Sequence, residues 1–320
     1  MIYFILFILA FTLTYFIKNY YIKNAILDEV NERSSHTVPT PHGGGIAIAV
    51  TWFLGLIYLQ YTNQIESTLF YALLVGICIS VVSFFDDVHD LSPKLRLCTQ
   101  AFVAIGGLIA IGGLRSIDFG FYTLLNPIIT NIFAFLLIVW YINLFNFLDG
   151  INGYAGSEAV FLSVAGLLLF GDLHFGILAV SVLGFLYWNW NKAKIFMGDV
   201  GSTLLGYNIA IFTIYYTNQE PTNLWIWIIL FALFWFDATL TLIRRKFNGE
   251  KLSLAHKKHA YQRLTQAGWS HYKVTNYAII INLILFLLVY FISNIFVVFL
   301  IAIMILYFAV KYIDNKKEFE

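Results

Sequence analysis

The chain has 320 residues, of which 60% are hydrophobic and only 12% are charged, with 19 Lys and Arg against 18 Asp and Glu. A water-soluble domain carries roughly 25% charged residues, so this composition excludes an ordinary soluble globule and indicates a protein that crosses a membrane several times. The formal net charge of +1 gives no reason to expect a nucleic acid as partner.

Eleven apolar stretches follow one another along the chain, separated by short polar segments. They cover approximately residues 1–17, 43–61, 67–85, 97–113, 123–145, 156–171, 175–190, 202–217, 223–243, 275–292 and 295–312. We therefore expect an all-α, polytopic membrane protein, with one domain over residues 1–320 and about eleven transmembrane helices. Ten is the alternative, because only Ser293 and Asn294 offer a turn within the last apolar run.

The basic residues are distributed very unevenly between the two sides that this topology defines. If the N-terminus is periplasmic, every one of the 19 Lys and Arg except Arg115 falls on the same side. Short loops that remain in the cytoplasm carry the excess of Lys and Arg. We therefore expect a multi-pass protein of the bacterial inner membrane. Its active-site loops would be cytoplasmic, at approximately residues 18–42, 86–96, 146–155, 191–201 and 244–274.

The first two polar segments carry glycines and paired acids. Residues 33–45 (RSSHTVPTPHGGG) end in three glycines before a helix, which either present backbone N–H groups to a phosphate or permit tight helix packing. Residues 86–96 (DDVHDLSPKLR) begin with Asp86 and Asp87 and include Lys94. Adjacent carboxylates repel each other, so one of them either holds a hard cation such as Mg²⁺ or accepts a proton. A solvated helix end is the alternative.

The next two polar segments add amides and further acids. In residues 143–156 (NLFNFLDGINGYAG), Asn143, Asn146 and Asp149 recur every third residue, near one face of a helix's last turns. The asparagines could instead bond a neighbouring helix. Residues 194–202 (KIFMGDVGS) form a glycine-flanked loop that enters a helix at Asp199, where a metal-bearing carboxylate can meet phosphate. Because acids at a membrane are costly and usually functional, we expect these segments to assemble one metal and phosphate site.

The fifth polar segment, residues 244–263, carries 7 of the 19 Lys and Arg, more than any other polar segment. A basic loop is often only a signal of topology, but His259 and Arg263 side by side suit a diphosphate. Asp237 is an acid well inside an expected span, residues 223–243. An acid in that position needs a partner, for which Arg244, two turns further on, is the natural candidate.

Together the motifs PTPHGGG, FFDDVHDLSPKLRL, NLFNFLDGINGYAG, WNWNKAKIFMGDVGS and HAYQRL resemble the polyprenyl-phosphate N-acetylhexosamine-1-phosphate transferases, relatives of the phospho-MurNAc-pentapeptide transferase. The last motif is most similar to the branch that initiates O-antigen or capsule synthesis. The resemblance implies a phosphotransferase that uses Mg²⁺, or Mn²⁺. It would move an N-acetylhexosamine or 6-deoxy-N-acetylhexosamine 1-phosphate from a UDP-sugar to undecaprenyl phosphate, with release of UMP. The lipid bilayer would be a further partner, and association with a second copy of the chain as a homodimer is one option.

The resemblance also implies roles for single residues. Asp86 and Asp87 would bind or deprotonate the lipid phosphate, without an indication of which acts as the base. Asp199 and Asp149 would lie at the metal, and His259 would face the diphosphate. The substrate-binding residues would be Asn146, Asn152, Asn189, Phe196, Lys94 and Arg263. Among them, Phe196 and Asn189 match residues that line a uracil pocket.

One position departs from the family pattern. The family usually reads DGxDG, whereas Asn152 replaces the second acid here; an amide can bond uracil or sugar but brings no charge.

The competing interpretation of the whole chain is a secondary transporter of a phosphorylated or anionic solute. Transporters place charged residues near the middle of the bilayer, while the charges here are expected at one face.

Overall fold

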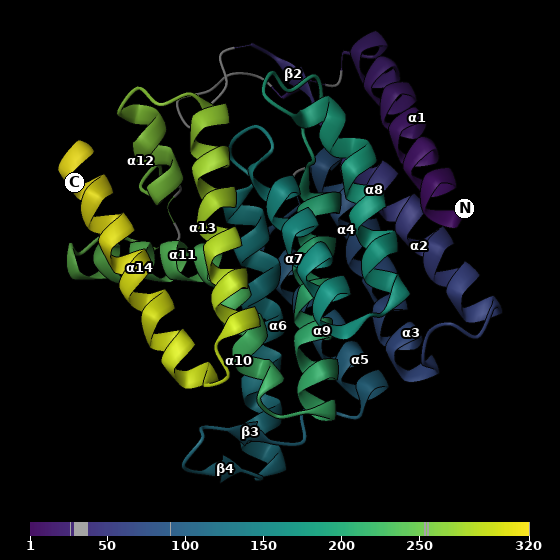
Figure 1. Ribbon diagram of the computed structural model, residues 1–320. Helices are drawn as coiled ribbons and strands as arrows, with labels where there is room; N and C mark the ends of the chain where they lie inside the picture. Colours follow the sequence, from purple (N-terminus) through teal and green to yellow (C-terminus); the bar gives the residue numbers. More distant parts are fainter. Residues whose placement is uncertain (26, 29–37, 90, 253, 255, 320) are drawn as a thin grey trace.

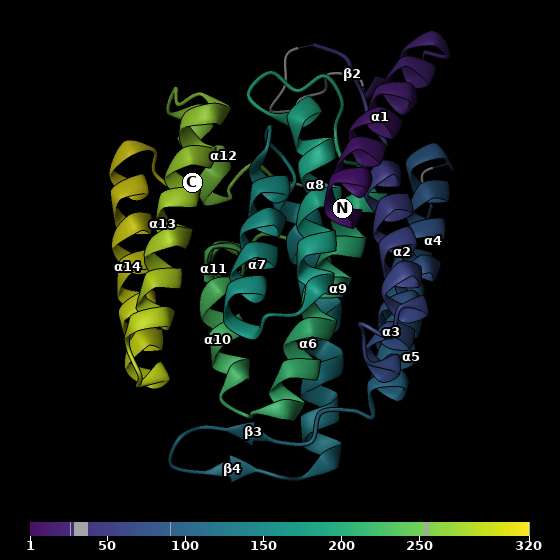
Figure 2. The ribbon, with the colours of Figure 1, turned by 45° about the vertical axis from the view of Figure 1, so that its right-hand side comes forward.

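The computed structural model describes residues 1–25, 27–28, 38–89, 91–252, 254 and 256–319, so Arg33 and Asp90 of the first two polar segments lie outside the described residues. The described chain is a bundle of helices with two small antiparallel strand pairs (Figures 1 and 2). The first seven helices are α1 (Ile2–Lys23), α2 (Gly45–Tyr61), α3 (Ser67–Leu74), α4 (Gly76–His89), α5 (Pro93–Ile111), α6 (Pro127–Leu148) and α7 (Tyr154–Phe170). The remaining helices are α8 (Leu173–Asn189), α9 (Asp199–Gln219), α10 (Asn223–Leu230), α11 (Ala232–Phe247), α12 (Ala260–Gln266), α13 (His271–Phe291) and α14 (Ile295–Lys316). The strand pairs are β1 (Leu27–Asp28) with β2 (Thr40–Pro41), and β3 (Ile117–Asp118) with β4 (Thr123–Leu124).

Local sequence accounts for several helix boundaries. The side chains of Ser92 and Asn126 accept hydrogen bonds from the first turns of α5 and α6, and each is followed by a proline at the first helical position. Such a residue satisfies backbone N–H groups that have no partner within the helix, and proline fits there because it has no N–H to satisfy. At its other end α5 stops at Gly112, whose φ of 79° is unfavourable for residues with a side chain.

All eleven expected apolar stretches contain helix, but the expectation of eleven, or ten, transmembrane spans is wrong. Among the described residues only six helical segments are long and apolar enough to cross a membrane, or seven if the bent pair α10 and α11 counts as one span. Helices α2, α7 and α8 have 17 residues each, about 25 Å of helix against about 30 Å of hydrocarbon. Helix α9 has 21 residues, but its sequence is too polar to qualify, and it is buried almost throughout.

Helix α9 forms the centre of the bundle. It packs against α4 and α6, with α2 also in contact, while α1 packs on the outside against α8 (Figure 1). Near its C-terminal end, aromatic rings of Phe212, Tyr216, Phe170 and Trp227 stack together, with ring centroids as close as 4.1 Å. Outer helices instead expose large apolar side chains, as expected of surfaces that face lipid.

The polar segments gather at one end of the bundle. The turns after α4, α6 and α8, the strand β2 and the helix α12 lie at the upper end in Figure 1, whereas the β3–β4 hairpin beside Arg115 lies at the lower end. Helices α10 and α11 are bent by 71° with respect to each other, so that α11 runs across the bundle. Segments far apart in sequence therefore meet at one polar surface.

Candidate active site

Acids from α4 and from the first turn of α9 lie at the centre of the polar surface at the upper end of the bundle. The backbone N–H of Asp199 donates a hydrogen bond of 3.1 Å to Oδ1 of Asp87. Oδ2 of Asp87 is buried and has no hydrogen-bond partner among the described residues. Gly198 precedes Asp199 with φ of 76°, and a Cβ atom there would lie 2.8 Å from Oδ2 of Asp87. Only glycine therefore allows the loop to approach this carboxylate.

Arg96 connects two of the carboxylates. Its Nε lies 2.7 Å from Oδ2 of Asp86, and its Nη1 lies 3.8 Å from Oδ2 of Asp199. The other oxygen of Asp86 accepts a hydrogen bond of 2.8 Å from the backbone N–H of Leu91. Asp86 is thus held by protein groups, whereas Asp87 has a free oxygen. Arg96 thus brings one positive charge next to two negatively charged side chains at this end of the bundle.

The end of α6 supplies an amide and a third acid. Nδ2 of Asn146 donates to Oδ1 of Asp199 at 2.8 Å and reaches Oγ of Ser202 at 3.2 Å. Asp149 follows the last residue of α6 and is half-buried; desolvation by the surrounding protein, together with the charges of Asp199 and Asp87, holds the pKa of the Asp149 carboxyl well above its usual range. A bound cation would reverse this effect. Asn146 and Asp149 therefore converge on Asp199.

Asn143, one turn earlier on α6, has a different role. Its amide exchanges hydrogen bonds of 2.8 and 3.4 Å with the amide of Gln100 on α5. The two interpretations of the asparagines thus apply to different residues, since Asn143 joins two helices and Asn146 enters the site.

The two loops expected to bind the nucleotide are tied to each other. Asn189 is buried; its Oδ1 accepts from the N–H of Gly153 at 2.8 Å, and its Nδ2 donates to the carbonyl of Ile195 at 2.9 Å. Nδ2 of Asn152 donates to the carbonyl of Asn191 at 2.8 Å. Asn189 and Asn152 therefore hold the loops in place. The half-buried Phe196 belongs to the same segment and follows Ile195 directly.

The glycines of the first polar segment are used for close packing at the two positions next to α2. The N–H groups of Gly44 and Gly45 donate to the carbonyls of Phe196 and Met197, at 2.9 and 2.8 Å, and the N–H of Phe196 donates to the carbonyl of Pro41 at 2.8 Å. A Cβ atom on Gly45 would lie 2.2 Å from the backbone nitrogen of Gly201. Of the two interpretations of this glycine run, these contacts favour packing.

The fifth segment covers the Asp149 loop from the side. The hydroxyl of Tyr261, on α12, donates to the carbonyl of Phe147 at 3.1 Å, and a Cβ atom on Gly150 would collide with that hydroxyl. The rings of His259 and Phe147 stack with centroids 6.4 Å apart. His259 is thus close to the end of α6, although it is buried and its Nδ1 has no hydrogen-bond partner among the described residues.

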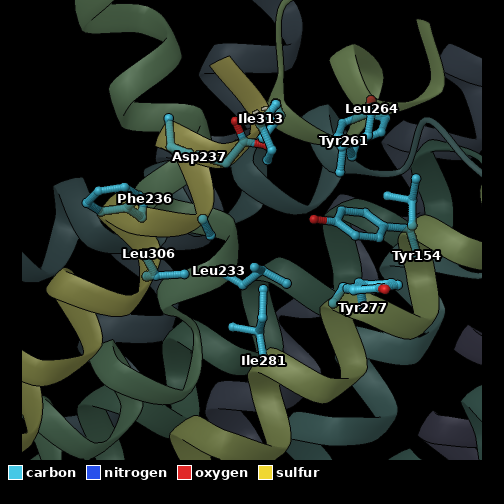
Figure 3. Close-up of a pocket in the computed structure, with 15 residues that line it drawn as sticks. Tyr154, Leu233, Phe236, Asp237, Tyr261, Leu264, Tyr277, Ile281, Leu306 and Ile313 are labelled. Carbon is cyan, nitrogen blue, oxygen red and sulfur yellow. Dashed lines mark hydrogen bonds between the residues drawn. The ribbon is translucent and has the colours of Figure 1, made fainter. Parts of the chain in front are cut away.

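The expected pairing of Asp237 with Arg244 is wrong. Both oxygens of Asp237 accept from the backbone N–H of Ala260, at 2.8 and 3.0 Å, and Oδ1 lies 3.8 Å from Nδ1 of His259. A helix N-terminus satisfies a carboxylate as a cation does, and sequence spacing does not reveal it. Asp237 also borders a cavity of about 70 Å³ that is otherwise mainly apolar, and the hydroxyl of Tyr154 points into it (Figure 3).

Two of the expected substrate-binding cations lie in contrasting places. Arg263 is buried, and its Nη2 lies 2.7 Å from Oδ1 of Asp314 and contacts the carbonyl of Lys317, so it ties α12 to α14. Arg244 pairs with the same Asp314 through two hydrogen bonds of 2.9 and 3.0 Å. Lys94, in contrast, is exposed on the first turn of α5. The structure therefore gives Arg263 an internal partner and leaves Lys94 at the surface.

The donors around Asp199 fit a magnesium ion in part. Among the residues that the structure describes, no three His, Cys, Asp or Glu side chains are grouped so as to hold a metal. Mg²⁺, however, is commonly held by one or two carboxylates together with substrate phosphates and water. The buried, unpartnered Oδ2 of Asp87 beside Asp199 has the chemistry of such a hard oxygen ligand. A complete coordination sphere would then require the substrate.

Comparison with known proteins agrees with this geometry. Residues 69–217 match the model of glycosyl transferase family 4. A probable undecaprenyl-phosphate N-acetylglucosaminyl 1-phosphate transferase of Bacillus subtilis (strain 168) is 32% identical over 273 residues, which cover 81% of this chain and 75% of the relative. The chain belongs to glycosyl transferase family 4.

Two further relatives of the chain are also transferases, and each is similar to it over most of its length. An undecaprenyl-phosphate alpha-N-acetylglucosaminyl 1-phosphate transferase of Yersinia pestis is 29% identical over 295 residues, covering 84% of this chain and 77% of the relative. A phospho-N-acetylmuramoyl-pentapeptide-transferase of Streptococcus pneumoniae (strain Taiwan19F-14) is 30% identical over 269 residues, covering 73% and 78%.

The stretch matched to glycosyl transferase family 4 contains the acids of α4, α6 and α9, together with Asn146 and Phe196, but neither the first polar segment nor α12. Within it, Arg96 contacts the central acids and Ser202 contacts the amide of Asn146, although neither was among the expected site residues. A signal for Arg96 existed in the sequence, because it follows the cap residue Ser92 by one helical turn and so lies at the same polar end as Asp86.

Proposed function

We propose that this protein transfers a sugar 1-phosphate from a UDP-N-acetylhexosamine, or its 6-deoxy form, to undecaprenyl phosphate and releases UMP. The observation that carries the proposal is the convergence of Asp87, Asp199 and Asn146 from three helices at one polar end of an apolar bundle. The names of the relatives support the same reaction, since they describe undecaprenyl-phosphate sugar 1-phosphate transferases.

The reaction needs an attacking phosphate and a stabilised leaving group. An oxygen of the lipid phosphate forms a bond to the sugar-bearing phosphorus of the UDP-sugar, the bond from that phosphorus to the bridging oxygen breaks, and UMP leaves. Phosphoryl transfer depends mainly on positioning and charge neutralisation. The free oxygen of Asp87 is placed to orient the lipid phosphate or hold its proton, and Arg96 faces the oxygens of Asp199 where negative charge collects.

A divalent cation, Mg²⁺ or Mn²⁺, would neutralise the diphosphate when bound, with Asp199 and Asp149 as the protein ligands we propose and Asp87 beside them. Asn146 orients Asp199 through its hydrogen bond of 2.8 Å. Asp149 is close enough to Asp199 and Asp87 for their charges to raise its pKa, so the three acids share one electrostatic environment.

An apolar groove along α6 would take part of the lipid tail. A groove of about 380 Å³ lies between α6, α10, α11 and α14, and its side chains are almost entirely apolar. Trp140 lines it and lies on α6, nine residues before Asp149, which follows the end of that helix, or about 14 Å along the helix axis. A polyprenyl chain in this groove would keep its phosphate near the end of α6.

We place the site on the cytoplasmic side of the bacterial inner membrane, because the topology expected from the sequence puts every Lys and Arg except Arg115 on the side of the polar segments. The product would be the first lipid-linked sugar of an O-antigen, capsule or other cell-envelope glycan. The transporter alternative loses support, since the site acids gather at one end of the bundle rather than at its middle.

The proposal is tested by incubating purified protein with undecaprenyl phosphate and, separately, UDP-GlcNAc, UDP-GalNAc and a UDP-6-deoxy-N-acetylhexosamine. We expect release of UMP that requires both the lipid and a divalent cation, with one donor preferred. Absence of UMP with every donor, in a preparation that binds undecaprenyl phosphate, would overturn the proposal. The donor panel also identifies the sugar.

A further inference from the structure

Asn152 is engaged by the protein through three of its polar groups. Its side-chain Nδ2 donates to the carbonyl of Asn191 at 2.8 Å. Its backbone N–H donates to Nδ1 of His271 at 3.4 Å, and its backbone carbonyl accepts from Oγ1 of Thr275 at 3.1 Å. The residue thus joins the loop after α6 to two other parts of the chain, the segment after α8 and the first turns of α13.

The acceptor of the side-chain bond has an unusual backbone. Asn191 has a φ of 56°, in the left-handed region that residues other than glycine and asparagine seldom adopt. The turn around Asn191 therefore sets the direction of the carbonyl that Asn152 meets. On either side of this contact, Asn189 accepts the N–H of Gly153, and the ring of Trp190 lies against the Cα of Gly153 so closely that a Cβ atom would be 2.8 Å away.

We propose that Asn152 is a positioning residue, a latch that holds the Asp149–Gly153 loop against the Asn189–Phe196 segment and α13. The chemistry requires an amide because the carbonyl of Asn191 can only accept a hydrogen bond, and a carboxylate at position 152 could not donate one. This explains why the chain reads DGING where the family usually reads DGxDG. Asn152 acts on the reaction by fixing where Asp149 and Phe196 lie.

A substrate-binding role for Asn152 predicts a different outcome for the same substitutions. If the amide bonded uracil or sugar directly, its loss would weaken donor binding and leave the ligand-free protein unchanged. If it is a latch, the loss loosens the ligand-free protein before any substrate arrives. Hydrogen exchange of the ligand-free protein therefore separates the two roles, and this measurement does not depend on the proposed function.

The first test compares Asn152→Asp and Asn152→Ala with the unaltered protein in detergent, without ligand. Both lack the donor, so we expect backbone N–H exchange at positions 152 and 153 to rise roughly tenfold in each, as for the loss of one hydrogen bond. Asn276→Ala is the matched control, because the amide of Asn276 donates only within its own helix, to the carbonyl of Tyr272, among the described residues. It should leave exchange in the loop unchanged.

The second test acts on the acceptor and retains Asn152. Asn191→Gly keeps the positive φ and should preserve slow exchange at Gly153, whereas Asn191→Val disfavours that φ and should raise exchange as Asn152→Asp does. Unchanged exchange in both Asn152 variants would overturn the latch, and a rise in donor KM with unchanged exchange would assign the amide to the donor instead. Faster exchange in a protein that releases no UMP would support the latch and refute only the proposed function.

The kinetic consequence rests on the proposed function. Loosening the loop should lower kcat/KM for the UDP-sugar about tenfold in Asn152→Asp, while the KM for undecaprenyl phosphate stays within about twofold. An equal loss for both substrates, without faster exchange, would also contradict the latch.

Discussion

The backbone N–H of Asp199 donates a hydrogen bond of 3.1 Å to the carboxylate of Asp87, although the two residues are 112 positions apart. The bond joins the start of α9 to the last turn of α4 and uses one oxygen of Asp87. The other oxygen is buried and has no partner among the described residues. We therefore expect Asp87, rather than Asp86, whose two oxygens both have partners, to act on the reacting phosphate.

Asp87→Asn should therefore abolish most of the turnover. The amide preserves size and can still accept the bond from Asp199, but it removes the charge, and losing such a preorganised group costs about 10²-fold or more in rate. Release of UMP measures the effect. Asp118→Asn, in the hairpin at the opposite end of the bundle, is the control and should turn over normally. A rate near normal for Asp87→Asn at saturating Mg²⁺ would remove Asp87 from the mechanism.

Arg96→Gln should be nearly as harmful as the loss of an acid. Without the guanidinium, Asp86 and Asp199 lose the one cation that faces both of them among the described residues. Arg96→Lys restores the charge but not two separate donors, so we expect it to recover part of the rate. Kinetics of UMP release with both variants tests this, and equal activity of Arg96→Gln and the unaltered protein would show that Arg96 is incidental.

Phe196→Ala should weaken use of the UDP-sugar more than use of the lipid. Stacking of an aromatic ring on a base is worth about 1–3 kcal/mol, so the donor KM should rise roughly 5- to 150-fold. Separate titration of donor and undecaprenyl phosphate measures the two KM values. If only the lipid KM increases, Phe196 does not contact the uracil.

Asp314→Asn tests the internal role of Arg263. The substitution removes the charge that faces both Arg263 and Arg244, and a hydrogen bond to a charged group contributes about 1.5–3 kcal/mol, so the free energy of unfolding should fall by about that amount. Thermal unfolding in detergent should show the loss, with little change in donor KM. A large change in donor KM without loss of stability would return Arg263 to the substrate.

Sidedness can be checked by labelling. In a background without Cys78 and Cys98, Lys192→Cys and Phe121→Cys place thiols at exposed positions on opposite ends of the bundle. We expect an impermeant reagent to reach position 121 from the periplasm and position 192 only after the membrane is opened. Labelling of both from the same side would refute the cytoplasmic placement of the site.

The sequence was a good guide to the polar segments and a poor guide to pairings and spans. Acids at a membrane stand out in an apolar chain, so Asp87, Asp149 and Asp199 were identifiable, and the structure brings Asp87 and Asp199 into contact. Spacing alone could not separate Asn143 from Asn146, because which amide enters the site depends on whether Gln100 or Asp199 lies opposite.

The span count failed for a related physical reason. Hydropathy does not distinguish a helix surrounded by lipid from one surrounded by other helices, and α9 is of the second kind. Helices α2 and α8, with 17 residues each, are too short to cross the full thickness of the bilayer, and they pack against neighbouring helices. The partner of Asp237 was missed because a backbone N–H of another segment leaves no trace in sequence spacing.

The backbone bonds between Gly44, Gly45 and the Phe196–Met197 segment also bear on how inactive variants should be interpreted. They hold the segment that leads into Asp199 against the first turn of α2, about 150 positions earlier in the chain. A random screen for loss of activity would therefore return substitutions at Gly45, where any side chain meets Gly201, with the phenotype of a damaged metal site. In such variants the substitution at Gly45 would have displaced Asp199. Adding cation to the assay would restore their activity only to the extent that Asp199 can move back to its original position.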